Sequence, residues 1–448
     1  MENNVSLRQN LLLLWDKRLL TIFMLGFCSG FPWVLHGSVL TLWMQEFGLS
    51  RSAIGYIGSI AVIYAFNWIW SPLVDEYRLP WLYRLLGRRR SWILLMQVAI
   101  AVSLLLLSNT DPSAGLALIT IFAFAIAFFS ATLDIAVDAY RINIFSEAEM
   151  EAKMPYAAAM AATGWWAGYG FIGGTIALWL GGETIGLDWP TVYRYLTLVY
   201  LLLMVLVCLV REPDVTVNEN ISIEAIPAGN GTARIQKLKN WFLDNVLDPF
   251  VEFFRRCGFR LGFSILLFLL LFRLGEGMLG KMSLVFYVEL GFSTEQIATY
   301  HNLFGGLVTA AFSILGALIN VRYGVVKGLF IGGVAMAAAN LLYAVMAKVG
   351  PEPSLFLFTL FVDNFCMAFS TVAAVSFMSY FTSRTYTGTQ YALMSSISNF
   401  GRTSLAASSG LLIDSLQGDW ALFFILTTIM VIPSLCLLVW IDKLLREY

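Results

Sequence analysis

Two aspartates and one arginine lie at helical intervals inside a long apolar stretch of the chain. Asp134 and Asp138 are four residues apart, and Arg141 follows three residues later. At 3.6 residues per turn, these side chains share one face of a helix. A charge at the centre of a bilayer costs about 2.5–3.5 kcal/mol and usually faces a polar cavity or a partner. We expect this face to line a transport pathway; alternatively, Asp138 and Arg141 pair at the cytoplasmic interface.

A second charged cluster lies in another apolar stretch, at Arg273 and Glu276. The two residues are three apart and can pair on one helical face. A free Glu276 is a candidate proton carrier beside Asp134 and Asp138, whereas a Glu276 that is paired with Arg273 would carry a proton poorly. We favour the pair, either as a permanent contact or as one that depends on conformation.

Polar residues also occur within the tenth and eleventh apolar stretches. Arg402 is a fixed cation in an apolar run, and Asn399 lies three residues before it. Arg402 either holds an anionic substrate or neutralises a carboxylate. Asp363 and Asn364 lie in the outer or middle part of their stretch, where we expect them to face a cavity or the outer interface.

Aromatic side chains mark the first and fifth apolar stretches. Trp33 and His36 follow Pro32, which frees a backbone carbonyl and is expected to kink the helix. Trp33 and His36 share a face and are candidate substrate contacts, although a single histidine in a helical bundle is also typical of a hydrogen-bonded structural residue. Trp165 and Trp166 suit either sugar faces or packing and bilayer anchoring.

The connection after the second stretch carries a carboxylate and a run of arginines. Asp75 closes the segment WSPLVD, and Gly87 precedes Arg88, Arg89 and Arg90. A carboxylate near a helix terminus can pair with guanidinium groups and with a helix dipole, and so latch one conformation. We expect Asp75, these arginines and Arg141 to act as a gate, unless the arginines only set the membrane orientation.

Composition identifies the class of protein that must position these residues. Hydrophobic residues make up 59% of the 448 residues and charged residues only 13%, about half of what a soluble protein carries. Apolar runs of membrane-spanning length predict an all-α polytopic membrane protein. The net charge of −1 gives no support for nucleic-acid binding. The five cysteines form no CxxC pair and the two histidines are far apart, so we expect no metal and no cofactor.

The apolar runs predict twelve transmembrane helices in two six-helix bundles. In chain order, we expect these helices at about 19–44, 53–74, 91–109, 114–142, 155–181, 191–210, 261–288, 296–320, 326–348, 354–382, 388–415 and 419–441. We expect an N-terminal bundle over 1–210, a cytoplasmic linker over 211–260 and a C-terminal bundle over 261–448. Alternate loops hold 22 basic residues against three in the others, which predicts that both termini are cytoplasmic. Within the linker, 235–250 has the pattern of an amphipathic helix that lies at the interface or caps the bundle.

A short internal repeat supports the two halves. The segment FGLS at 47–50 recurs as LGFS at 290–293, each after the first predicted helix of its half. Duplicated halves are typical of transporters that rock two bundles about a site near the membrane midplane.

Several of these segments resemble the muropeptide permease (AmpG) branch of the major facilitator superfamily. The segments are SGFP at 29–32, WSPLVD at 70–75 with GRRR at 87–90, SATLDIAVDAYR at 130–141, RLGE at 273–276, and TQYALMSS at 389–396 with Gly401 and Arg402. The resemblance implies proton-driven import of peptidoglycan-derived muropeptides across the bacterial inner membrane. The same branch is similar to siderophore and acetyl-CoA permeases. The chain departs from the GxxxDxxGRR signature of the superfamily at Ser71, where glycine is usual, and in its longer 75–87 spacing. It departs from the branch at Asn143, where a carboxylate is usual, and in lacking two extra spans that some members carry.

A membrane-embedded acyl- or glycosyltransferase is the alternative from a different class. It would need clustered His, Asp or Ser residues beside a substrate-binding loop, whereas the outer loops here are short. No phosphate-binding loop of the type GxxxxGK[ST] is present, which argues against a primary pump. We therefore expect a non-enzymatic transporter that acts as a monomer in the lipid bilayer on a small-molecule substrate, with protons as the coupling ion.

Overall fold

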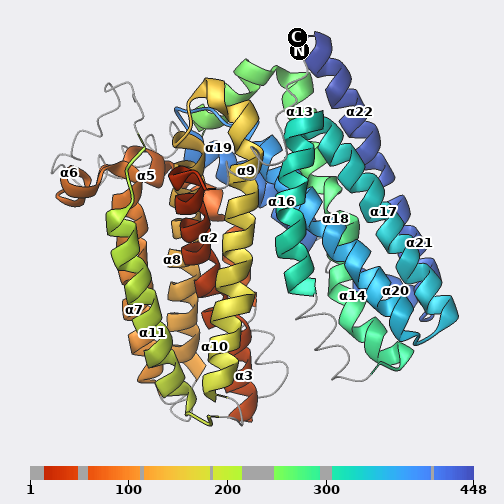
Figure 1. Cartoon of the computed structure of the whole chain (residues 1–448), viewed down its shortest axis with the longest axis horizontal. Helices are drawn as coiled ribbons and strands as arrows, with labels where there is room; N and C mark the ends of the chain where they lie inside the picture. Colours follow the sequence, from red (N-terminus) through yellow and green to blue (C-terminus); the bar gives the residue numbers. More distant parts are fainter. Residues whose placement is uncertain are drawn as a thin grey trace, which may run out of the picture. The chain divides into compact units, whose positions relative to one another are not determined.

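The computed structural model describes residues 15–48, 59–110, 116–181, 185–213, 247–292, 305–404 and 408–447, and these are largely helical (Figure 1). Eight helical stretches in this part of the chain are long and apolar enough to cross a membrane. They are Lys17–Glu46, Arg88–Ser108, Leu116–Asn143, Trp189–Leu209, Phe259–Leu290, Val325–Val349, Pro353–Tyr380 and Trp420–Glu447. They correspond to the predicted helices one, three, four, six, seven, nine, ten and twelve.

The four remaining predicted helices are the second and fifth of each half, and their described parts are shorter or interrupted. They comprise η1 (Ser59–Ala65), η2 (Asn67–Ile69) and α5 (Ser71–Glu76); α9 (Glu147–Trp166), the π-helix η4 (Ala167–Gly174) and α10 (Thr175–Gly181); α16 (Gly305–Tyr323); and α19 (Thr387–Thr403) with α20 (Ser409–Ser415). The prediction of an all-α polytopic protein with twelve transmembrane helices is confirmed.

Contacts divide the chain into two compact units. Unit 1 comprises Met1–Ala148, Thr163–Val251 and Thr382–Ala392, and unit 2 comprises Glu149–Ala162, Glu252–Phe381 and Leu393–Tyr448. The helices α9 and α19 thus contribute residues to both units. The sequence-based boundaries at 210 and 261 stay a prediction. Most of the predicted amphipathic segment lies outside the described residues, and a helix is described over 247–257.

Unit 1 is built around the long helix α8 (Leu116–Asn143). It packs against α2 (Lys17–His36) and against α7 (Arg88–Ser108), which in turn runs beside α11 (Trp189–Leu209), as Figure 1 shows. Helix α2 begins at a local cap, because the Asp16 carboxylate accepts a hydrogen bond from the backbone N–H of Arg18 at 2.9 Å. It ends at Gly37, where α3 (Ser38–Glu46) begins.

Unit 2 is also built from long helices that pack side by side. Helix α17 (Val325–Val349) packs against α18 (Pro353–Tyr380) and α21 (Trp420–Ile429), and α13 (Phe259–Phe272) packs against α22 (Ile432–Glu447). Helix α14 (Leu274–Leu290) continues α13 after a break at Arg273.

The repeated FGLS and LGFS segments have a common backbone role. Gly48 follows α3 with φ of +80°, and Gly291 caps α14 with φ of +105°. Glycine adopts this left-handed conformation without the steric cost of a Cβ atom, so each repeat ends the first helix of its half in the same way.

Candidate functional site

The two aspartates of α8 have different partners within unit 1. Asp134 Oδ1 accepts a hydrogen bond of 2.6 Å from the Ser29 hydroxyl on α2. Asp138 Oδ1 lies 2.6 Å from Arg141 Nη1, as the spacing predicts. The Asp138 side chain is 27% exposed, whereas Arg141 is buried and its guanidinium also lies over the Tyr391 ring at 4.9 Å. Both carboxylates are therefore held by polar partners and are only partly covered by protein.

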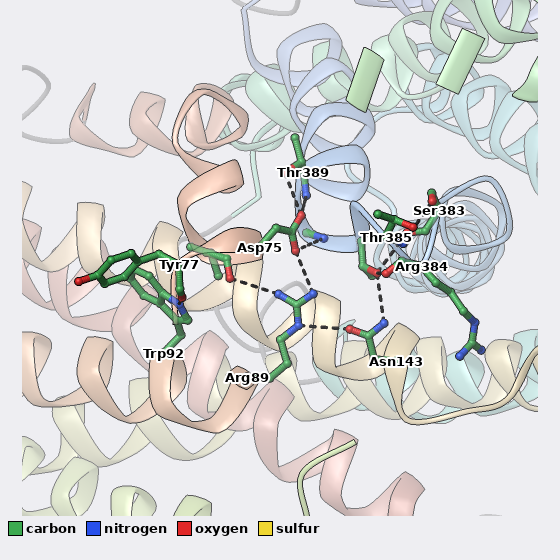
Figure 2. Close-up of polar contacts among 12 residues, drawn as sticks. Asp75, Tyr77, Arg89, Trp92, Asn143, Ser383, Arg384, Thr385 and Thr389 are labelled. Carbon is green, nitrogen blue, oxygen red and sulfur yellow. Dashed lines mark hydrogen bonds and ion pairs between the residues drawn. The ribbon is translucent and has the colours of Figure 1, made fainter. Parts of the chain in front are cut away.

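Asp75 is the centre of a buried polar network, shown in Figure 2. Its side chain is 1% exposed, and Oδ1 accepts a hydrogen bond of 2.9 Å from Arg89 Nη2. The backbone N–H of Gly388 donates to Oδ1 at 3.0 Å, while the N–H and hydroxyl of Thr389 donate to Oδ2 at 2.7 and 2.8 Å. Asp75 thus satisfies the first free N–H groups of α19 and neutralises Arg89 at the same time.

Asn143 extends this network on its other side. Its Oδ1 accepts from Arg89 Nε at 3.2 Å, and its Nδ2 donates to the Thr387 hydroxyl at 3.1 Å (Figure 2). The Asn143 amide is therefore both an acceptor and a donor. A carboxylate at this position could accept from Arg89 but could donate to Thr387 only if it were protonated. Glycine at position 388 leaves room for the Asp75 carboxylate, because a Cβ atom there would lie 2.9 Å from Asp75 Oδ1.

Local structure explains why Arg89 points inward. Gly87 has φ of +83° and directly precedes α7. The Glu212 carboxylate accepts from the backbone N–H groups of Arg89 and Arg90 at 2.6 and 3.1 Å, which caps this helix. Burial raises the pKa of Glu212, and the same two N–H groups oppose that rise. No role for Glu212 follows from the sequence, in which it is an acidic residue just after the sixth apolar run.

The three predicted gating arginines have separate roles. Among the described residues, only Arg89 of the three contacts Asp75. The guanidinium of Arg90 donates to the backbone carbonyls of Val207 and Cys208 at the end of α11. Arg88 lies half-buried in the first turn of α7.

Unit 2 holds a second cluster, at the break between α13 and α14. Arg273 donates from Nε and Nη2 to the Glu276 carboxylate at 3.0 and 2.7 Å, so the pair is bidentate. Arg402 Nε lies 3.7 Å from Glu276 Oε1, and its side chain is 45% exposed. Two guanidinium groups around one carboxylate leave a net positive charge, with Arg402 the more accessible of the two. A Cβ atom at Gly277 would lie 2.3 Å from the Arg402 carbonyl oxygen, so α14 and α19 are in direct contact here.

The other predicted polar residues of unit 2 have hydrogen-bond partners outside the Arg273–Glu276–Arg402 cluster, although the Asp363 carboxylate interacts electrostatically with Glu276. Asp363 Oδ2 accepts a hydrogen bond of 3.1 Å from the Tyr343 hydroxyl. Asn364 accepts from Thr309 at 3.1 Å and donates to the carbonyl of residue 360 at 2.8 Å. Asn399 is half-buried on α19, one turn before Arg402.

In unit 1, the predicted aromatic contacts form a cluster with a residue that the sequence did not single out. His36 Nε2 lies 3.1 Å from the Tyr64 hydroxyl, and both side chains are buried. The Trp33 and Tyr64 ring centroids are 4.2 Å apart. His36 thus has the hydrogen-bonded environment that the structural alternative requires.

Taken with the fold, these sites define a polytopic membrane transporter with ionisable residues inside its helical units. The family model of the Major Facilitator Superfamily matches residues 22–321, and the chain belongs to this family. A Rickettsia conorii protein named as transporter AmpG 4 is 30% identical over 95% of this chain and 97% of its own length. The anhydromuropeptide permease of Escherichia coli K12 is 26% identical over 96% of this chain and 81% of its own length.

Solved structures support the same fold. The Major Facilitator Superfamily transporter FucP, in its outward conformation, has a TM-score of 0.67 at 14% identity, covering 95% of this chain and 99% of its own. The predicted resemblance to the superfamily and to its AmpG branch is confirmed.

Proposed function

We propose that this protein is a proton-coupled importer of an anionic solute, and that the solute is a peptidoglycan-derived muropeptide. The site that carries this proposal is the Arg273–Glu276–Arg402 cluster, whose net positive charge suits a substrate carboxylate. The identity of the solute is supported by similarity to the Escherichia coli protein named anhydromuropeptide permease. In this proposal the protein lies in the bacterial inner membrane with both termini in the cytoplasm.

Asp134 and Asp138 are the proposed proton-coupling residues. Asp138 pairs with Arg141 on its own helix, so protonation can release this pair without first separating two helices. Asp134 is tied to α2 through Ser29, so its protonation would act on a contact between helices. Glu276 is the weaker candidate, because two arginines already neutralise it.

The Asp75–Arg89–Asn143 network is the proposed gate. It connects the second, third and fourth predicted helices to the start of α19, and its groups are buried. Its opening would release the α19 segment 387–392 from the rest of unit 1.

Substrate uptake into proteoliposomes tests the proposal. The purified protein should accumulate radiolabelled GlcNAc-anhydro-MurNAc-peptide when the outside is acidified, and much less without a pH gradient. A ferric siderophore and acetyl-CoA are the comparison solutes. If the muropeptide is not taken up under either condition, the substrate assignment is wrong.

Counterflow exchange separates coupling from binding. Asp138→Asn should lose gradient-driven uptake but keep exchange of labelled for unlabelled muropeptide, since exchange needs no net proton movement. The matched control is Asp188→Asn, an exposed cap of α11, which should change neither assay. Arg402→Ala should weaken both assays, because it removes a substrate contact rather than a coupling group.

A further inference from the structure

Close contact between two helices of unit 1 brings a set of aromatic rings together. A Cβ atom at Gly30 would lie 2.2 Å from the Trp165 carbonyl oxygen. A Cβ atom at Gly164 would lie 2.1 Å from the Phe23 carbonyl oxygen, and one at Gly168 would lie 2.4 Å from that of Phe27. The backbones of α2 and of the α9–η4 segment therefore touch, as only glycines allow.

This contact places Trp33 of α2 against Trp165 of α9. The Trp33 and Trp165 ring centroids are 5.9 Å apart in an edge-to-face arrangement, and Trp33 also lies against Tyr64 at 4.2 Å. On its other side, Trp165 stacks on Tyr169 at 5.0 Å with an interplanar angle of 22°. Tyr169 belongs to the π-helix, a form that is frequently found at functional sites.

These rings are not fully enclosed and are bordered by polar groups. Trp33, Trp165 and Tyr169 are half-buried, whereas Tyr64 is buried and fixed by His36. Within the described residues, the indole N–H of Trp33 is buried without a hydrogen-bond partner. Ser29, which binds the Asp134 carboxylate, lies one turn before Trp33 on α2.

We infer that Trp33, Trp165 and Tyr169 form a stacking surface for a pyranose ring of the substrate. The inference rests on the proposed function, and it assigns the sugar part of the solute to these three rings of unit 1. Half-buried aromatic faces offer apolar contact to the C–H face of a sugar, and the free Trp33 N–H offers a donor to a ring hydroxyl. Tyr64 and His36 position Trp33 and do not themselves contact the sugar.

Binding of the disaccharide alone tests this surface. The probe is GlcNAc-anhydro-MurNAc without peptide, and its dissociation constant for the full chain in nanodiscs is measured by saturation-transfer NMR. Trp165→Ala should weaken binding about tenfold, as expected for loss of about 1.4 kcal/mol of ring contact. Trp165→Phe keeps a ring and should retain most of the affinity. Trp179→Ala, which removes a 65%-exposed tryptophan of α10, should leave binding unchanged.

The outcomes separate this inference from the proposed function. If the wild-type protein does not bind the disaccharide, or if Trp165→Ala binds it like wild type, the stacking surface is refuted even where muropeptide uptake is normal. If the disaccharide binds and Trp165→Ala weakens it, the surface stands even where uptake of the complete muropeptide fails. If Trp165→Ala fails to fold, Tyr169→Ala and Tyr169→Phe are compared in the same binding assay.

Discussion

Substitution of Asp75 by asparagine is the most direct test of the proposed gate. The change removes the charge opposite Arg89 and replaces one oxygen that accepts from the N-terminal N–H groups of α19. Removal of one partner from a buried, hydrogen-bonded ion pair costs about 3–5 kcal/mol. Asparagine retains one carbonyl oxygen, so we expect the lower end of this range. At about 1.4 kcal/mol per factor of ten, a cost of about 3 kcal/mol raises the open population about 100-fold.

A cysteine introduced at a buried position of α19 can measure the population in which the gate is open. Ala392 on α19 is 3% exposed within the core of unit 1. In a background without the five native cysteines, Ala392→Cys should react slowly with a membrane-impermeant maleimide. When opening is fast compared with labelling, the labelling rate follows the open population. Asp75→Asn should therefore accelerate labelling by up to about 100-fold, limited by the intrinsic rate of an exposed thiol.

Asp188→Asn is the matched control for this experiment. Asp188 also caps a helix, since its carboxylate accepts from the Thr191 N–H at 3.2 Å, but it lies at the start of α11. Asparagine caps a helix about as well as aspartate, so this substitution should change local helix stability little and leave labelling unchanged. Equal labelling of Asp75→Asn and wild type would refute the gate, as would equal acceleration by both substitutions.

Three further predictions concern stability and can be measured by thermal unfolding of the purified protein. Gly164→Ala should lower the melting temperature by several degrees, because its Cβ atom would lie 2.1 Å from a backbone oxygen, whereas Gly170→Ala, with nothing within 4 Å, should not; equal effects would contradict the close helix contact. Burial and, to a smaller extent, the charge of Asp75 raise the pKa of Glu76 to about 7. The protonated form of Glu76 therefore stabilises the folded protein at low pH, and this contribution to stability is lost as the pH rises through about 7. Wild type should melt at a higher temperature at pH 5 than at pH 8, and Glu76→Gln should reduce this difference; an unchanged difference would exclude Glu76 as its source. Glu212→Ala should lower the melting temperature by removing the cap of α7, with Glu212→Gln intermediate, since the amide keeps one acceptor oxygen.

The sequence was sufficient for the helices and for pairs within one helix. Apolar runs predict span number because the bilayer fixes their length, and the confirmed twelve-helix fold follows from that constraint. The Asp138–Arg141 pair could be predicted because its residues lie three apart on one helix. Arg273 and Glu276 are also three residues apart, and they pair although Arg273 lies at the break between α13 and α14. In each case the geometry is set locally.

Contacts between distant segments could not be predicted in this way. Nothing in the spacing of the three arginines selects Arg89 as the partner of Asp75; the cap from Glu212, over a hundred residues away, helps to orient that turn. Tyr64 was missed as the partner of His36 for the same reason, because 28 residues separate them. The π-helix left no signal in the apolar pattern, since it only widens a helix that the pattern already predicts.

Asn143 gives the proposed gate a specific electrical property. Asp75 and Arg89 cancel each other, and the amide between Arg89 and Thr387 adds no charge. Membrane voltage does about 2.3 kcal/mol of work per elementary charge per 100 mV, and it does this work only on a net charge that moves. Separation of this cluster from the start of helix α19 therefore moves no net charge of the cluster through the membrane field. Any voltage dependence of transport would then arise from charges outside the cluster, such as the proton, the charged solute or Arg402 on the same helix.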